Sequence, residues 1–162
     1  MSVNIDMIAA SLVKQFTQKG LKLATAESCT GGLVAAAITA IPGSSSIFTH
    51  GFVTYANEAK IQMLGVPEAL LAEHGAVSAP VAIAMAAGAC QRAEVDYAIS
   101  TTGIAGPDGG TAQKPVGTVW FGLAGPAGTE AYHKLFEGDR ESIRLQAVAF
   151  ALALLAQQGD NE

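Results

Sequence analysis

Residues 25–32 read TAESCTGG, and they join two segments of different periodicity. The residues before this turn, LKLAT at 21–25, alternate like a short strand, whereas LVAAAI at 33–38 is typical of a helix. Gly31 and Gly32 supply the backbone freedom that a sharp change of direction needs. This strand–turn–helix unit indicates an α/β fold.

Helices and strands alternate along the rest of the chain without a linker or a repeat. The last two predicted strands flank a Gly-Pro turn and are expected to form an antiparallel hairpin, whereas the earlier strands are expected to be parallel. We therefore expect one domain over residues 1–162, a three-layer α/β/α fold with a mixed central sheet. Periodicity predicts further helices at 3–19, 57–64, 67–74, 78–92 and 139–157, and strands at 47–55, 97–101, 117–124 and 130–136.

The charge and the hydropathy pattern exclude two classes of partner. Nine Lys and Arg against 14 Asp and Glu give a net charge of −5, which argues against nucleic acid, because its phosphates require clustered basic residues. No apolar run approaches the roughly 18 residues that a membrane span needs. Residues 1–6 lack the features of a signal peptide, so we expect a soluble, cytoplasmic protein.

The metal-ligating residue types form no recognisable metal motif. His50, His74 and His133 lie far apart in the sequence, and we expect no metal site. Cys29 and Cys90 have no zinc-type spacing and are expected to be reduced thiols. Cys29 is a second candidate nucleophile, although a small buried thiol is the simpler interpretation.

Ser28 lies where the predicted strand ends and a helix begins. Backbone N–H groups and the helix dipole would stabilise an anion there, so Ser28 is a candidate nucleophile. Amides of Thr30, Gly31 and Gly32 are candidates for holding either a phosphate or the oxyanion of an acyl-transfer intermediate. The alternative is that Ser28 or Thr30 is simply the helix N-cap.

Lys60 follows the predicted strand at 47–55 and is a candidate base. A partly buried lysine can lose its proton, and a Ser–Lys pair can replace a Ser–His–Asp triad in acyl transfer. The alternative is a solvated helix lysine paired with an acid such as Glu58. Nothing in the local sequence decides between the two.

A glycine-rich loop, GIAGPDGG at residues 103–110, is a candidate ligand cradle. It lacks the Gly-Lys-Ser/Thr ending of a nucleotide-binding P-loop, and a tight surface turn is the alternative. Gly103 and Gly106 belong to this loop, and Thr102 precedes it at the end of a predicted strand, where sheets of this type bind ligands.

Arg140 is placed unfavourably by the expected N-cap, Asp139. A cation in the first turn of a helix opposes the helix dipole, which suggests an anionic partner. That partner is either a substrate phosphate or a neighbouring acid, Asp139 or Glu141. Arg144, one turn further on, could join either arrangement.

Five stretches together resemble the CinA C-terminal domain family, and the resemblance covers residues 5–157. It implies an α/β fold of the short, stand-alone form of that family, without the additional N-terminal domain of its larger members. The stretches are TAESCTGG at 25–32, GFVTYANEAK at 51–60, GAVS at 75–78, GIAGPDGG at 103–110 and KPVGTVW at 114–120.

The resemblance also implies an activity, the hydrolysis of nicotinamide mononucleotide to nicotinate mononucleotide and ammonia in pyridine nucleotide salvage. Ser28 would be the nucleophile and Lys60 its base, with Tyr55 and Thr102 as hydrogen-bonding or proton-shuttling groups. Arg140 would bind substrate, no cofactor is implied, and a homodimer is expected. Two alternatives stay open: a non-catalytic nucleotide-binding module and an amidohydrolase of another small amide.

Overall fold

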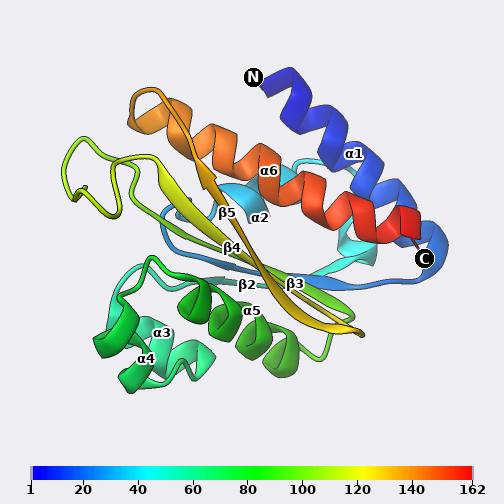
Figure 1. Cartoon of the computed structure of the whole chain (residues 1–162). Coiled ribbons are helices and arrows are strands. Elements are labelled where there is room, and N and C mark those ends of the chain that lie inside the picture. Colours follow the sequence, from blue (N-terminus) through cyan, green and yellow to red (C-terminus); the bar gives the residue numbers. More distant parts are fainter. Residues whose placement is uncertain (1, 162) are drawn as a thin grey trace.

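The computed structural model describes residues 2–161 and contains one five-stranded sheet (Figure 1). The strand order is β2-β1-β3-β4-β5. β1 pairs in parallel with β2 and β3, and the pairs β3–β4 and β4–β5 are antiparallel. The strands are β1 (Leu23–Glu27), β2 (Phe48–Val53), β3 (Tyr97–Gly103), β4 (Thr118–Gly125) and β5 (Gly128–Leu135).

Helices cover both faces of this sheet (Figure 1). α1 (Ser2–Lys19), α2 (Leu33–Thr39) and α6 (Arg140–Asn161) pack on one face over the larger apolar core. α5 (Ala79–Ala93) packs on the other face, with α3 (Asn57–Leu64) and α4 (Glu68–His74) against it. The prediction of a three-layer α/β/α fold with a mixed sheet is therefore confirmed, including the late antiparallel hairpin.

The first strand begins two residues later than its alternation predicts. The Leu21 N–H still belongs to the end of α1, where it donates to Phe16 O, and the Lys22 N–H donates to the Asp96 carboxylate. All five residues of β1 are buried, because this strand lies inside the sheet and is covered on both faces. Sequence alternation is a poor guide to such a strand.

The α5 face is packed closely because two glycines leave room for backbone. A Cβ at Gly88 of α5 would lie 2.0 Å from the Leu64 carbonyl oxygen at the end of α3. A Cβ at Gly122 of β4 would lie 2.2 Å from the Ala82 carbonyl oxygen of α5. These close approaches fix the position of α3, the helix that carries Lys60, against the rest of the layer.

The three parallel strands end at one edge of the sheet. Ser28 directly follows β1, Tyr55 follows β2, and Thr102 is the penultimate residue of β3. The chain leaves β1 through α2 on one face and passes from β2 to β3 through α5 on the other. Connections that leave on opposite faces open a crevice at the carboxyl edge, and ligands bind there in folds of this type.

Candidate active site

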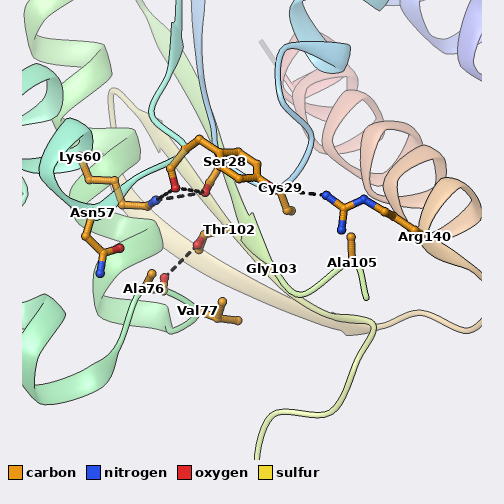
Figure 2. Close-up of a pocket in the computed structure, with 11 residues that line it drawn as sticks. Ser28, Cys29, Asn57, Lys60, Ala76, Val77, Thr102, Gly103, Ala105 and Arg140 are labelled. Carbon is orange, nitrogen blue, oxygen red and sulfur yellow. Dashed lines mark hydrogen bonds between the residues drawn. The ribbon is translucent and has the colours of Figure 1, made fainter. Parts of the chain in front are cut away.

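A cavity of about 210 Å³ opens at this carboxyl edge (Figure 2). Its lining contains six of the residues proposed from the sequence: Ser28, Tyr55, Lys60, Thr102, Gly103 and Arg140. They come from segments up to 112 positions apart, as between Ser28 and Arg140, and only the fold brings them together. Cys29, the second candidate nucleophile, also lines the cavity, and the lining is completed by Asn57, Ala76, Val77 and Ala105.

Lys60 and Ser28 are in direct contact at the base of this cavity. The Lys60 Nζ lies 3.0 Å from the Ser28 Oγ, 2.8 Å from the Thr54 carbonyl oxygen and 3.2 Å from the Tyr55 carbonyl oxygen. A neutral amine has two N–H donors and one lone pair. With both N–H groups donated to the two carbonyls, the lone pair faces the Ser28 hydroxyl, so this geometry suits proton abstraction from serine.

Burial gives Lys60 the pKa that such a base requires. The side chain is 1% exposed, and desolvation lowers its pKa from 10.5 to about 8. No carboxylate of the described residues forms an ion pair with it. The alternative of a solvated lysine paired with Glu58 is therefore wrong.

The turn after Ser28 is organised by a residue to which the sequence analysis gave no role, Glu27. Its carboxylate accepts hydrogen bonds from the Thr30 hydroxyl and from the backbone N–H groups of Gly32, Val34 and Ala35. The N-terminus of α2 is thus occupied by an anion from the chain itself. Glu27 caps the helix, so the alternative in which Ser28 or Thr30 does so is wrong.

This arrangement corrects the expected role of the glycine amides. The Gly31 N–H donates to the Ser28 carbonyl at 3.0 Å and the Gly32 N–H to the Glu27 carboxylate at 3.1 Å, so neither is available to an oxyanion. The Thr30 side chain is fully buried and bonded to Glu27 and Thr101. None of Thr30, Gly31 and Gly32 lines the cavity.

Arg140 lines the cavity on the side away from Lys60 (Figure 2), and Tyr55, whose side chain is exposed, belongs to the same lining. The guanidinium donates to the Tyr55 hydroxyl at 3.1 Å and to the Gly106 carbonyl at 2.7 Å. Gly106 itself lies outside the lining and acts on the site through this contact. Asp139 caps α6 as predicted, through a 2.9 Å bond from the Ser142 N–H. Arg140 has no acidic partner among the described residues, so its charge is available to an anionic ligand.

Thr102 connects β3 to the loop before α5. Its hydroxyl donates to the Ala76 carbonyl at 2.9 Å, which holds the segment of Ala76 and Val77 against the cavity (Figure 2). Lys114, from the glycine-rich connection, donates to the His74 carbonyl at 2.7 Å at the start of the same loop. Thr102 therefore shapes the wall of the cavity.

Cys29 lines the cavity, but its thiol is poorly suited to act as a nucleophile. Burial raises the pKa of its thiol to about 12, which favours the buried, protonated role over that of a nucleophile. Among residues 2–161, no group of three or more His, Cys, Asp or Glu side chains is arranged to hold a metal ion. The helices within this range are too short or too polar to span a membrane.

Sequence reasoning missed Asn57 and the Ala76–Val77 segment as parts of the lining. Asn57 is the first residue of α3, one turn before Lys60, so its place on the same helix end was the one available signal. Ala76 and Val77 carry no functional group, and only the tertiary contact with Thr102 brings them to the site.

Comparison with known proteins agrees with this arrangement. The family model described as the CinA C-terminal domain matches residues 5–158. Nicotinamide-nucleotide amidohydrolase PncC of Escherichia coli K12 is 57% identical over 141 residues, which cover 86% of each chain. A competence-damage inducible protein of Symbiobacterium thermophilum is 58% identical over 93% of this chain, but the chain spans only 37% of that longer protein.

Solved structures of related proteins have the same fold. The competence/damage inducible protein CihA of Agrobacterium tumefaciens superposes with a TM-score of 0.90 at 44% identity, covering 95% of this chain and 94% of that one. A CinA superfamily protein of Klebsiella pneumoniae gives 0.93 at 37% identity, covering 98% and 99%. The chain therefore belongs to the CinA C-terminal domain family.

Proposed function

We propose that this protein is a serine amidohydrolase that converts nicotinamide mononucleotide and water to nicotinate mononucleotide and ammonia. One observation supports this class of reaction: the Nζ of buried Lys60 lies 3.0 Å from the Ser28 Oγ. The name of the E. coli relative, which shares 57% identity, supports the choice of substrate.

In the first half of the reaction, neutral Lys60 takes the proton of the Ser28 hydroxyl as the Oγ attacks the carboxamide carbon. The carbonyl π electrons move to oxygen and give a tetrahedral oxyanion. When this intermediate collapses, the C–N bond breaks and Lys60 returns the proton to the departing nitrogen. Ammonia leaves, and the nicotinoyl group remains as an ester on Ser28.

In the second half, water replaces the amine. Lys60, neutral again, takes a proton from the water as its oxygen attacks the ester carbon. Collapse of the second intermediate breaks the bond to Ser28 Oγ, which recovers its proton from Lys60. The product is a carboxylate, so the hydrolysis consumes one water and needs no redox partner or nucleotide cofactor.

Arg140 is the group that we assign to the substrate phosphate. Two of its five N–H donors are engaged by Tyr55 and Gly106, and the remaining donors and the positive charge suit a phosphate at the rim. The structure gives Tyr55 and Thr102 positioning contacts, to Arg140 and Ala76, and these are the roles that we propose for them. The reaction would serve the recycling of nicotinamide nucleotides.

The test is ammonia release and product mass after incubation of purified protein with nicotinamide mononucleotide without added metal. Ser28→Ala and Lys60→Met should each abolish turnover, while the exposed counterparts Ser11→Ala and Lys14→Met should retain it. Turnover that persists in folded Ser28→Ala would remove Ser28 as the nucleophile. Tight nucleotide binding without turnover in the wild type would favour a binding module instead.

A further inference from the structure

Arg144 is a partly buried cation that no step above uses. From the second turn of α6, its Nε donates to the Cys29 carbonyl at 3.0 Å and its Nη2 to the Thr30 carbonyl at 3.2 Å. No carboxylate of residues 2–161 forms an ion pair with it. The guanidinium is therefore committed to two backbone carbonyls in the turn that directly follows Ser28.

The same turn is also held at its first peptide. The Ser28 carbonyl accepts the Gly31 N–H at 3.0 Å, and the Ser28 N–H donates to the Thr101 carbonyl of β3 at 2.9 Å. Gly31 has a φ of +58°, and a Cβ on it would lie 3.1 Å from the Arg144 Nη2. A side chain at this position would crowd the guanidinium, so glycine permits both the backbone conformation and the contact.

Fixing these carbonyls also fixes the opposite ends of their peptide units. In a trans peptide the C=O and the N–H point in opposite directions. Holding the Ser28 carbonyl therefore directs the Cys29 N–H, and holding the Cys29 carbonyl from Arg144 directs the Thr30 N–H away from the guanidinium.

These two N–H groups differ from the amides that follow them. Neither the Thr30 N–H nor the Cys29 N–H donates to another residue within the described part of the chain. Thr30 is fully buried outside the cavity, whereas Cys29 lines it, so the Cys29 N–H is the one within reach of a ligand. The Gly31 and Gly32 amides are already engaged. The backbone N–H of the residue after a nucleophilic serine is well placed to donate to the oxyanion, because the serine Oγ is bonded to the carbon that carries the oxyanion.

We propose that Arg144 is a positioning residue for the hydrolysis: by holding the Cys29–Thr30 peptide, it keeps the backbone N–H of Cys29, which lines the cavity, in place as an oxyanion donor. Arg144 touches no reacting atom in this scheme. It keeps the Cys29–Thr30 peptide from turning its carbonyl toward the cavity. This inference rests on the proposed amidohydrolase function.

The test compares Arg144→Gln and Arg144→Lys with Arg92→Gln, which removes an exposed arginine at the end of α5. Each variant is assayed on nicotinamide mononucleotide and on its thiocarboxamide analogue. Sulfur accepts hydrogen bonds more weakly than oxygen, so misplacement of the donor should slow hydrolysis of the amide more than hydrolysis of the thioamide. The ratio of the two rates does not depend on how much of the protein is folded.

We expect Arg144→Gln to lower kcat on the amide by about 10- to 100-fold with KM nearly unchanged, and to lower the amide-to-thioamide rate ratio. Arg144→Lys keeps the charge but cannot span both carbonyls, and it should fall in between. Arg92→Gln should match the wild type in both respects.

Three results are distinguishable. An unchanged kcat in Arg144→Gln overturns the inference, and so does an equal loss on both substrates, which would make Arg144 merely structural. A wild-type protein that hydrolyses neither substrate contradicts the proposed function instead. In that event the rate of Ser28 acylation by p-nitrophenyl acetate, followed by mass, decides the inference: it must fall in Arg144→Gln and not in Arg92→Gln.

Discussion

Lys60 is placed so that one side chain serves as both proton acceptor and proton donor. Its amine donates to the backbone carbonyls of Thr54 and Tyr55, and the lone pair of the neutral amine is then directed at Ser28. Because burial rather than a neighbouring cation lowers the pKa, the neutral form arises without any substrate bound. About a tenth of the free enzyme therefore already holds the neutral base at pH 7.

The pH dependence of the rate follows from this pKa. The reactive form is neutral Lys60, so kcat/KM should rise from pH 6 to pH 8 by about 50-fold and level off above pH 9, as expected for one group of pKa about 8 in the free enzyme. The check is a pH profile of initial rates at substrate concentrations well below KM. A rate that stays constant down to pH 6 would remove Lys60 from the base role.

Stability should depend on pH through the same group. Its folded pKa of about 8 lies below the usual 10.5, so the unfolded state binds more protons between these values and stability rises with pH. Relative to Lys60→Met, the wild type should gain about 2 kcal/mol in free energy of unfolding between pH 7 and pH 9.5. Denaturant unfolding of both proteins at the two pH values measures this, and an equal change in both would contradict it.

The pairing of Ser28 with Lys60 could be expected only through family resemblance, because no local pattern joins residues 32 positions apart. Glu27 was visible in the sequence but carried no sign of its role. Its carboxylate reaches amides five to eight positions later, well beyond the three-residue spacing of a capping box. A helix whose cap comes from the preceding strand offers no local signature.

At the scale of elements, periodicity predicted the helices well and the inner strands less well. The α3 limits, 57–64, agree with the prediction, and the helix ends at Gly65, whose φ of 71° is a conformation that glycine adopts readily. β1 is buried on both sides and contains the polar residues Thr25 and Glu27. The strand predicted from alternation, 21–25, therefore begins and ends two residues too early. Tertiary burial overrides local pattern in such strands.

Gly88 gives a test of how precisely α5 must place α3. A methyl group at this position would meet the Leu64 carbonyl oxygen at 2.0 Å, so Gly88→Ala should push α3 outward and separate Lys60 from Ser28. We expect a loss of about 1–3 kcal/mol in stability and a marked fall in kcat. Ala87→Ser, on the exposed side of the same helix, is the matched control. Normal stability and activity in Gly88→Ala would show that the close contact is dispensable.

At the scale of the whole molecule, the site is assembled by topology. Parallel pairing of β1 with both β2 and β3 brings the segments that carry Ser28, Lys60 and Thr102 to one edge. α6, the last helix, then supplies Arg140 and Arg144 from the opposite layer. The strand order could not be predicted from the sequence, because local patterns do not say which strands pair. The homodimer that the family resemblance implies stays a prediction, and a measurement of the molar mass in solution would test it.

Arg140 joins three distant parts of this assembly, and its proposed ligand is the substrate phosphate. Arg140→Gln should raise KM for nicotinamide mononucleotide by about 10- to 100-fold, the loss expected for one charge-assisted contact. It should change KM for nicotinamide riboside, which lacks the phosphate, far less. A matched rise for both substrates would instead assign Arg140 to the shape of the rim.

The antiparallel hairpin has a practical consequence for anyone who wishes to label this protein. Because β4 runs against β3, its first residues pair with Gly103 beside the cavity and its last residues pair with Ala98 at the opposite end of the sheet. The turn between β4 and β5 thus lies a full strand length away from Ser28, and Pro126 and Ala127 at its tip are exposed. A fluorophore or an affinity handle inserted between them would leave the chemistry undisturbed.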